Sequence, residues 1–91
     1  MKKSTRLYLS GSVQSMFFKQ FIKDAANKQN VKGFLRSLED GRAEIFLEGE
    51  TSAVDSMIEI CKKGPQHAQI RNIEQKEEKF QDFKDFKILK F

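Results

Sequence analysis

The pattern of hydrophobic and polar positions predicts that the chain opens with a strand followed by a helix. The run Leu7-Tyr8-Leu9 is typical of a strand, which we place over about Arg6–Ser10. From Phe18 onward the apolar residues recur at helical spacing, so a helix is expected over about Phe17–Gln29. A short polar loop that begins at Gly11 joins the two elements.

The next segment reads as a pair of strands joined by a tight turn. Strands are expected over about Val31–Leu38 and Arg42–Glu48. The residues between them, Glu39-Asp40-Gly41, form a hairpin turn, because Asp-Gly supplies the positive φ that a short connection needs. Apolar and charged residues alternate along the second of these strands. One of its faces is therefore expected to be buried and the other to be wet.

A second amphipathic helix follows the hairpin. We expect Thr51 or Ser52 to cap it and Gly64-Pro65 to end it. Its apolar stripe has the spacing i, i+3, i+4, i+7 and consists of Val54, Met57, Ile58 and Cys61. The stripe predicts that the only cysteine of the chain is a small hydrophobic core residue.

The last third of the chain completes the fold. A strand is expected through Ala68, Ile70 and Ile73, then an exposed loop over Glu74–Gln81, and a final strand over Phe86–Phe91. Two β-α-β halves with right-handed crossovers place both helices on one face of an antiparallel sheet. The expected fold is α+β, a ferredoxin-like α/β sandwich of order β-α-β-β-α-β that forms a single domain over residues 1–91.

Composition narrows the class of protein. A hydrophobic content of 38% with 33% charged residues and one Pro favours a globular domain over a disordered chain. No apolar run approaches the roughly 18 residues needed to cross a bilayer, so no membrane association is expected. A single Cys cannot form an internal disulfide, which agrees with a reducing compartment. We expect a cytoplasmic monomer.

Charge is distributed unevenly along the sequence. Residues 1–36 carry eight Lys or Arg against one acid, a net +7, whereas residues 37–91 carry nine against twelve, a net −3. The positive half includes the junction of the first strand and the first helix. We expect its potential to attract small anions to that junction, although a basic surface with no ligand is an equally simple interpretation.

The junction itself has the features of an anion-binding loop. Unpaired N–H groups and the positive end of the helix dipole converge at a helix N-terminus, and Lys19 adds a full charge there. The candidate loop residues are Ser12, Val13, Gln14, Ser15, Met16, Phe17, Phe18 and Lys19. The ligand that such a loop fits is a small phosphorylated or carboxylate anion.

Three segments resemble the signatures of the acylphosphatase family. Gly11–Lys19 reads G-S-V-Q-S-M-F-F-K against the family's G-x-V-Q-G-V-x-F-R. Gly33–Gly41 parallels G-[WF]-V-[RK]-N-x-x-D-G, and Gly64–Ile70 parallels G-P-x-x-A-x-[IV]. The resemblance implies the ferredoxin-like fold and a phosphate held by loop amides and an Arg. It also implies a water oriented by an Asn on the second strand, with no metal, cofactor or covalent intermediate.

The sequence departs from the family where the chemistry occurs. Lys19 stands at the position of the catalytic Arg, and Ser37 at that of the catalytic Asn. A lysine keeps the charge but loses the planar fork of the guanidinium. A serine side chain is shorter than that of asparagine. Its single hydroxyl oxygen both donates and accepts, whereas asparagine has an NH₂ donor and a separate carbonyl acceptor. The resemblance therefore implies that hydrolysis of acyl phosphates is weak or lost.

Structural interpretations of these residues stay open beside the functional ones. Lys19 could be a solvent-facing helix cation, and Ser37 a solvated strand-end residue before a turn. Ser15 replaces a family Gly, and it would be strained if φ there were positive. His67, the only histidine, is expected on a surface loop.

Two other functions compete with hydrolysis. One is a non-catalytic scaffold that binds an anion or a partner's carboxylate in the same loop. The other is RNA binding, since RNA-recognition motifs share the element order and Lys32-Gly33-Phe34 resembles the start of their RNP1 element. The residues that follow lack the alternating aromatics of RNP1, which argues against nucleic acid as the partner.

Overall fold

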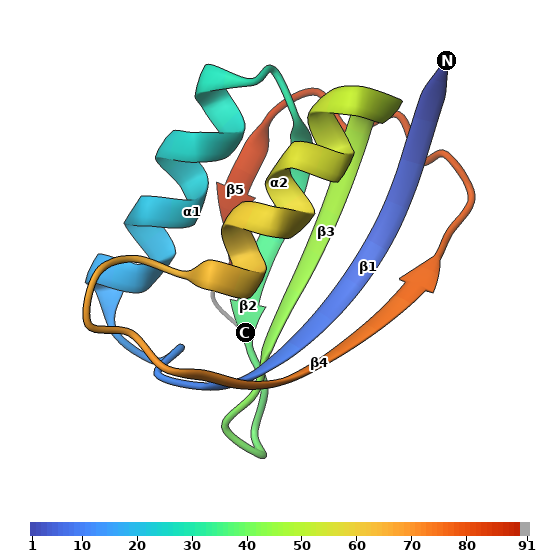
Figure 1. Cartoon of the computed structure of the whole chain (residues 1–91). Coiled ribbons are helices and arrows are strands. Elements are labelled where there is room, and N and C mark those ends of the chain that lie inside the picture. Colours follow the sequence, from blue (N-terminus) through green and yellow to red (C-terminus); the bar gives the residue numbers. More distant parts are fainter. Residues whose placement is uncertain (90–91) are drawn as a thin grey trace.

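The computed structural model describes residues 1–89 of the chain and contains two helices and five strands (Figure 1). In chain order the elements are β1 (Lys2–Gly11), α1 (Met16–Lys28), β2 (Lys32–Ser37), β3 (Ala43–Glu50), α2 (Thr51–Lys63), β4 (Ile70–Glu77) and β5 (Phe86–Ile88). Within this described part, the helices are too short and too polar to span a membrane.

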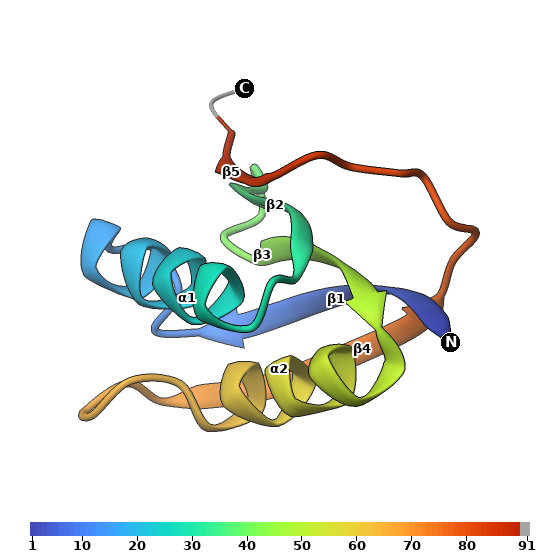
Figure 2. The ribbon, with the colours of Figure 1, turned by 90° about the horizontal axis from the view of Figure 1, so that it is seen from above.

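The strands form one sheet in the order β4-β1-β3-β2-β5. The four strands of the two β-α-β halves pair antiparallel, as the sequence predicts. The added strand β5 instead pairs parallel to β2, with Gly33 opposite Phe86, so the five-stranded sheet is mixed. Both helices lie on one face of the sheet, and the connection from β4 to β5 runs on the other side (Figure 2). The ferredoxin-like α+β fold is thus confirmed.

The main core lies between the helices and the sheet. Every second residue of the central strands points into it, including Leu7 of β1, Ile45 of β3 and Leu35 of β2. The apolar stripe of α2 supplies Val54, Met57, Ile58 and Cys61 from the other side. Cys61 is fully buried, and this burial raises the pKa of its thiol to about 12. Its predicted role as a core residue is confirmed.

The opposite face of β3 is also buried, so the expectation that this face is wet is wrong. Glu44, Phe46 and Glu48 point away from the helices, yet all three are almost fully buried. The connection between β4 and β5, residues 78–85, crosses this face of the sheet and covers Phe46 and Glu48 (Figure 2); we call it the crossing segment. A local sequence pattern does not show that a distant segment will cover a strand.

Glu48 joins the crossing segment to the sheet. Its carboxylate accepts hydrogen bonds from the backbone N–H groups of Gln81 and Phe83, the latter at 2.8 Å, and from Ser4 Oγ at 2.9 Å. The ring of Phe83 packs against those of Phe34 and Phe46, with centroids 5.8 and 5.2 Å away. Polar and aromatic contacts therefore both hold the crossing segment in place.

Glu44 is surrounded by cations on the same face. Arg6 and Arg36 both donate to its carboxylate, and Arg6 also pairs with Glu78 of the crossing segment at 3.1 Å. The guanidinium of Arg6 lies 5.2 Å from the ring centroid of Phe46. A buried carboxylate is tolerated only when it is paired in this way.

Several element boundaries differ from the expected ones. The first four residues of the expected exposed loop, 74–77, continue β4, because they pair with β1 up to the contact of Glu77 with Thr5. The N-cap of α2 is Glu50, and its side chain makes no capping hydrogen bond. Thr51 is the first helical residue, and its hydroxyl donates to Met1 O instead. The end of the expected last strand, residues 90–91, lies outside the described residues.

Candidate functional site

The loop between β1 and α1 is anchored to both neighbouring loops. The N–H of Ser12 donates to Gln69 O at 2.8 Å, which ties the loop to the start of β4. The side-chain amide of Gln14 donates to Gly41 O in the turn between β2 and β3. Gly11 has φ +124°, and a Cβ there would lie 2.1 Å from Gln69 O, so only glycine allows this close approach. The fold therefore fixes the position of the loop.

Ser15 is the N-cap of α1. Its backbone is extended, with φ −74° and ψ 152°, and its Oγ accepts the N–H of Phe18 at 3.1 Å. Because φ is negative, the strain that a serine would suffer at a positive φ does not arise. The serine instead satisfies one of the unpaired donors at the start of the helix.

Four consecutive backbone amides of the loop remain available. Within residues 1–89, the N–H groups of Ser12, Val13, Phe18 and Lys19 all have acceptors inside the protein. For the N–H groups of Gln14–Phe17 no acceptor is recorded in the same range, and all four residues are exposed. The first turn of α1 contains no acidic residue that could compete for them. These amides offer donors and the positive end of the helix dipole to an anion.

Lys19 adds a charge to this end of the helix. Its side chain is half-buried, and no ion pair is recorded for it in the described part of the chain. The positive end of the helix dipole repels a lysine in the first turn of the helix. An anion bound at the loop amides would relieve this repulsion.

Ser37 is the last residue of β2, and its side chain shares the helix-facing side of the strand with Leu35. It is only 9% exposed, so the interpretation as a solvated strand-end residue is wrong. Its hydroxyl is buried and has no hydrogen-bond partner among the described residues. A buried hydroxyl without a partner costs free energy, about 1–3 kcal/mol.

The uneven charge of the sequence is partly cancelled in three dimensions. Lys3, Arg6 and Arg36 of the positive half pair with acids of the negative half. Lys2 lies at the start of β1, and the loop lies at its other end. Of the basic residues in the first 36, Lys19 and Lys23 of α1 are the first to follow the loop along the chain. The positive potential at the site thus rests on fewer groups than the sequence suggests.

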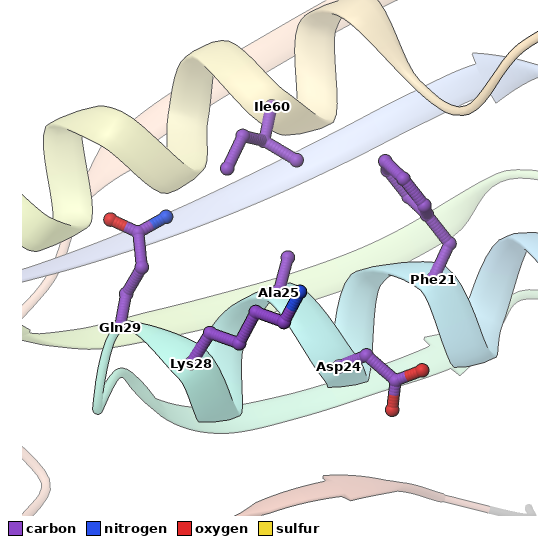
Figure 3. A pocket seen from close by; sticks show the side chains of 6 residues that line it. All are labelled: Phe21, Asp24, Ala25, Lys28, Gln29 and Ile60. Carbon is purple, nitrogen blue, oxygen red and sulfur yellow. The ribbon is translucent and has the colours of Figure 1, made fainter.

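Two cavities are candidate positions for a bound ligand. One of about 220 Å³ lies beside the loop and is lined by Ser12, Ser15, Phe17, Phe18, Pro65, Gln66, His67 and Ala68. A larger one of about 440 Å³ lies between the helices, where Ile60 of α2 faces Phe21 and Ala25 of α1 (Figure 3). The larger cavity extends to the C-terminal end of α1, whose dipole disfavours anions. The geometry favours the loop as the anion site.

Other chemistries find less support in residues 1–89. No group of three or more His, Cys, Asp or Glu side chains in this range could hold a metal ion. His67 is exposed on a loop, as expected. Phe34 and Phe46, which could have offered rings to RNA bases, are covered by Phe83 of the crossing segment. Nothing in the local sequence indicates that the turn around His67 lies beside the loop, because this contact arises from the pairing of β1 with β4.

Comparisons with known proteins show the family of this chain. The acylphosphatase family model matches residues 5–88. An acylphosphatase of Rubrobacter xylanophilus is 42% identical over 72 residues, which are 79% of this chain and just under two thirds, 66%, of that relative. One of Haloquadratum walsbyi is 42% identical over 67 residues, 74% of this chain and 72% of the relative.

A solved structure supports the same assignment. The crystal structure of an acylphosphatase from Bacillus subtilis has a TM-score of 0.90 and 28% identity, and the match covers 99% of this chain and 100% of that one. The similarity thus extends over the sheet, both helices and the loop between β1 and α1. On these grounds the chain belongs to the acylphosphatase family.

Proposed function

We propose that the protein binds a phosphate-type anion at the amides of Gln14–Phe17 and that it hydrolyses acyl phosphates weakly or not at all. The observation that carries the proposal is the run of four exposed residues at the start of α1, next to Lys19, whose N–H groups have no acceptor within residues 1–89. Membership of the acylphosphatase family supports the class of ligand. The carboxyl-phosphate bond of an acyl phosphate is the bond that the family name implies.

The weakness of catalysis follows from the chemistry of Lys19. A guanidinium grips two phosphate oxygens at once, whereas an ammonium on a flexible stem is a point donor. Misplacement of a reacting group by about 1 Å costs on the order of 10²-fold in rate. Loss of one transition-state donor costs about 10²–10³-fold. A lysine in place of the arginine therefore lowers the rate of hydrolysis more than the affinity for the anion.

The burial of Ser37 favours the second candidate, a non-catalytic scaffold that binds an anion or a partner's carboxylate. Its Oγ is out of contact with solvent, so a water held by this hydroxyl would have to be internal. A catalytic water must reach the bound phosphate and be replaced after each turnover. A site with an accessible anion cradle and a buried Ser37 suits binding better than hydrolysis.

Turnover of benzoyl phosphate tests the catalytic part of the proposal. We expect little activity above the uncatalysed rate in the wild type, and at least about 10² times more in the double variant Lys19→Arg, Ser37→Asn. Each single change should give much less, because positioning the phosphate and positioning the water act as a unit. Lys23→Arg, one turn further along α1, is the matched control and should change nothing.

Two outcomes would contradict this reasoning. A wild type with high turnover that neither substitution improves would show that Lys19 and Ser37 suffice for catalysis. A folded double variant as inactive as the wild type would place the defect outside this pair. Circular dichroism establishes that the double variant is folded, which is needed because Ser37 is buried.

Thermal unfolding in phosphate tests the binding part. A ligand at about ten times its Kd stabilises the folded state by RT ln(1 + [L]/Kd), or about 1.4 kcal/mol. We expect this gain in the wild type and in Lys23→Ala, and its loss in Lys19→Ala. Phosphate stabilisation that survives unchanged in Lys19→Ala would place the anion site elsewhere.

A further inference from the structure

The cavity of about 220 Å³ beside the loop adjoins the amides assigned to the anion. Ser15 and Phe17 belong both to the set of available amides and to the wall of this cavity. The opposite wall comes from the turn before β4, through Pro65, His67 and Ala68. The organic group carried by an anion bound at these amides can therefore reach this cavity.

The wall of the cavity combines apolar side chains with the polar side chains of two serines, a glutamine and a histidine. Phe17 is 69% exposed, although a large aromatic side chain usually gains by burial. Pro65 and Ala68 add aliphatic surface from the other side. The residues that line the cavity, all within the described range, include no Asp, Glu, Lys or Arg. Such a wall suits a neutral organic group and disfavours a second charge.

The far wall is held rigidly against the loop. The N–H of Ala68 donates to Pro65 O at 3.0 Å and closes a four-residue turn. His67 occupies its third position with φ +71°, a left-handed conformation that is unfavourable for a non-glycine residue. The hydrogen bond from Ser12 to Gln69 O then ties this turn to the loop. Backbone strain of this kind persists at ligand sites because the surrounding structure enforces it.

We propose that this cavity binds the organic part of the phosphorylated ligand and makes the protein selective for phosphate esters or acyl phosphates that carry one small neutral apolar group. The inference rests on the proposed anion site. The volume is below the roughly 300–1,000 Å³ of pockets for drug-sized ligands. A single ring or a short aliphatic chain is therefore the size of group that it selects.

The experiment compares the affinities of three monosubstituted phosphates that differ in this group. Isothermal titration of the full chain with methyl phosphate, phenyl phosphate and phosphoglycolate gives their Kd values, with inorganic phosphate as the reference. We expect phenyl phosphate to bind about tenfold more tightly than methyl phosphate, equivalent to about 1.4 kcal/mol. Phosphoglycolate, which carries a second anionic group, should gain nothing over methyl phosphate.

Two variants locate the effect. Phe17→Ala removes the aromatic wall and keeps the backbone N–H of residue 17, so the preference for phenyl phosphate over methyl phosphate should fall to less than twofold. Phe80→Ala is the matched control, because Phe80 is also an exposed phenylalanine, at 52%, but lines neither this cavity nor the proposed anion site. It should keep the full preference.

A proton NMR signal gives an independent readout. His67 is the only histidine, so its ring Cε1–H proton gives one identifiable signal. Phenyl phosphate should shift this signal, through the ring current of the bound phenyl group, and methyl phosphate should leave it in place. A shift of equal size with both ligands would overturn the assignment of the cavity to the organic group.

The outcomes separate this inference from the proposed function. If phosphate and methyl phosphate bind but phenyl phosphate binds no more tightly, the cavity assignment is wrong and the anion site stands. If phenyl phosphate is preferred equally by the wild type and Phe17→Ala, its ring binds elsewhere and the inference fails. If none of the phosphates binds, both proposals fail together.

Discussion

The contact between Glu48 and the crossing segment allows a quantitative prediction about stability. Glu48→Ala removes a 1%-exposed carboxylate that accepts two backbone N–H groups and one hydroxyl. Hydrogen bonds to a charged group contribute about 1.5–3 kcal/mol each. Gln81 is exposed and Phe83 half-buried, so water can replace part of what is lost there. We therefore expect a loss of about 3 kcal/mol in the free energy of unfolding.

That loss is large for a chain of this size. At roughly 0.05–0.15 kcal/mol per residue, 91 residues give a total stability of about 5–14 kcal/mol. Urea unfolding measures the change. Glu50→Ala is the control, because Glu50 lies on the same strand, its side chain is 60% exposed, and its one ion pair among residues 1–89 is with the N-terminal amine. An exposed ion pair contributes at most about 1 kcal/mol.

Hydrogen exchange distinguishes the local mechanism from a general loss of stability. The amides of Gln81 and Phe83 should be protected in the wild type and exchange rapidly in Glu48→Ala. The protection of amides in the centre of β3 should fall only as far as the loss of global stability requires. The reasoning is refuted if Glu48→Ala costs less than about 1 kcal/mol, or if the amides of Gln81 and Phe83 stay protected in it.

Two further predictions concern the start of α1 and the core. Ser15→Ala should lower the free energy of unfolding by about 1 kcal/mol, since it removes the N-cap acceptor of the Phe18 amide. Phosphate binding should persist in this variant because no donor is lost, and titration of the folded protein would expose an error here. Cys61 should resist iodoacetamide near pH 8, because burial raises the pKa of its thiol to about 12 and leaves about one thiol in ten thousand ionised. Alkylation of the native protein as fast as of the urea-unfolded protein would contradict the buried position.

The sequence predicts the elements that depend on local pattern and the order in which they pair. The apolar stripes of both helices, the Asp40-Gly41 turn and the burial of Cys61 all follow from spacing and turn chemistry. The antiparallel core of the sheet follows from the right-handed crossovers. For this part of the fold, local propensity and tertiary structure agree.

The features that escaped prediction all depend on contacts between distant segments. Glu44 and Glu48 have the sequence pattern of solvent-facing residues of β3. Glu48 is instead buried under the crossing segment, and Glu44 is buried against two arginines. Ser37 reads as exposed for a similar reason, since nothing in its neighbours along the chain indicates that its hydroxyl faces the helix layer. The expected strain at Ser15 is absent because the residue caps the helix in an extended conformation.

The pairing of β5 with β2 has a consequence for self-association. Without β5, the six residues of β2, which include Phe34 and Leu35, would form the edge of the sheet. An exposed edge strand with apolar residues is a template for the addition of strands from other chains. Three residues, Phe86–Ile88, pair with half of that edge, and the other edge strand, β4, carries four charged side chains among its eight residues. By covering half of the β2 edge, the C-terminal strand β5 disfavours aggregation through β2. With three residues, β5 is itself too short to offer a long exposed edge.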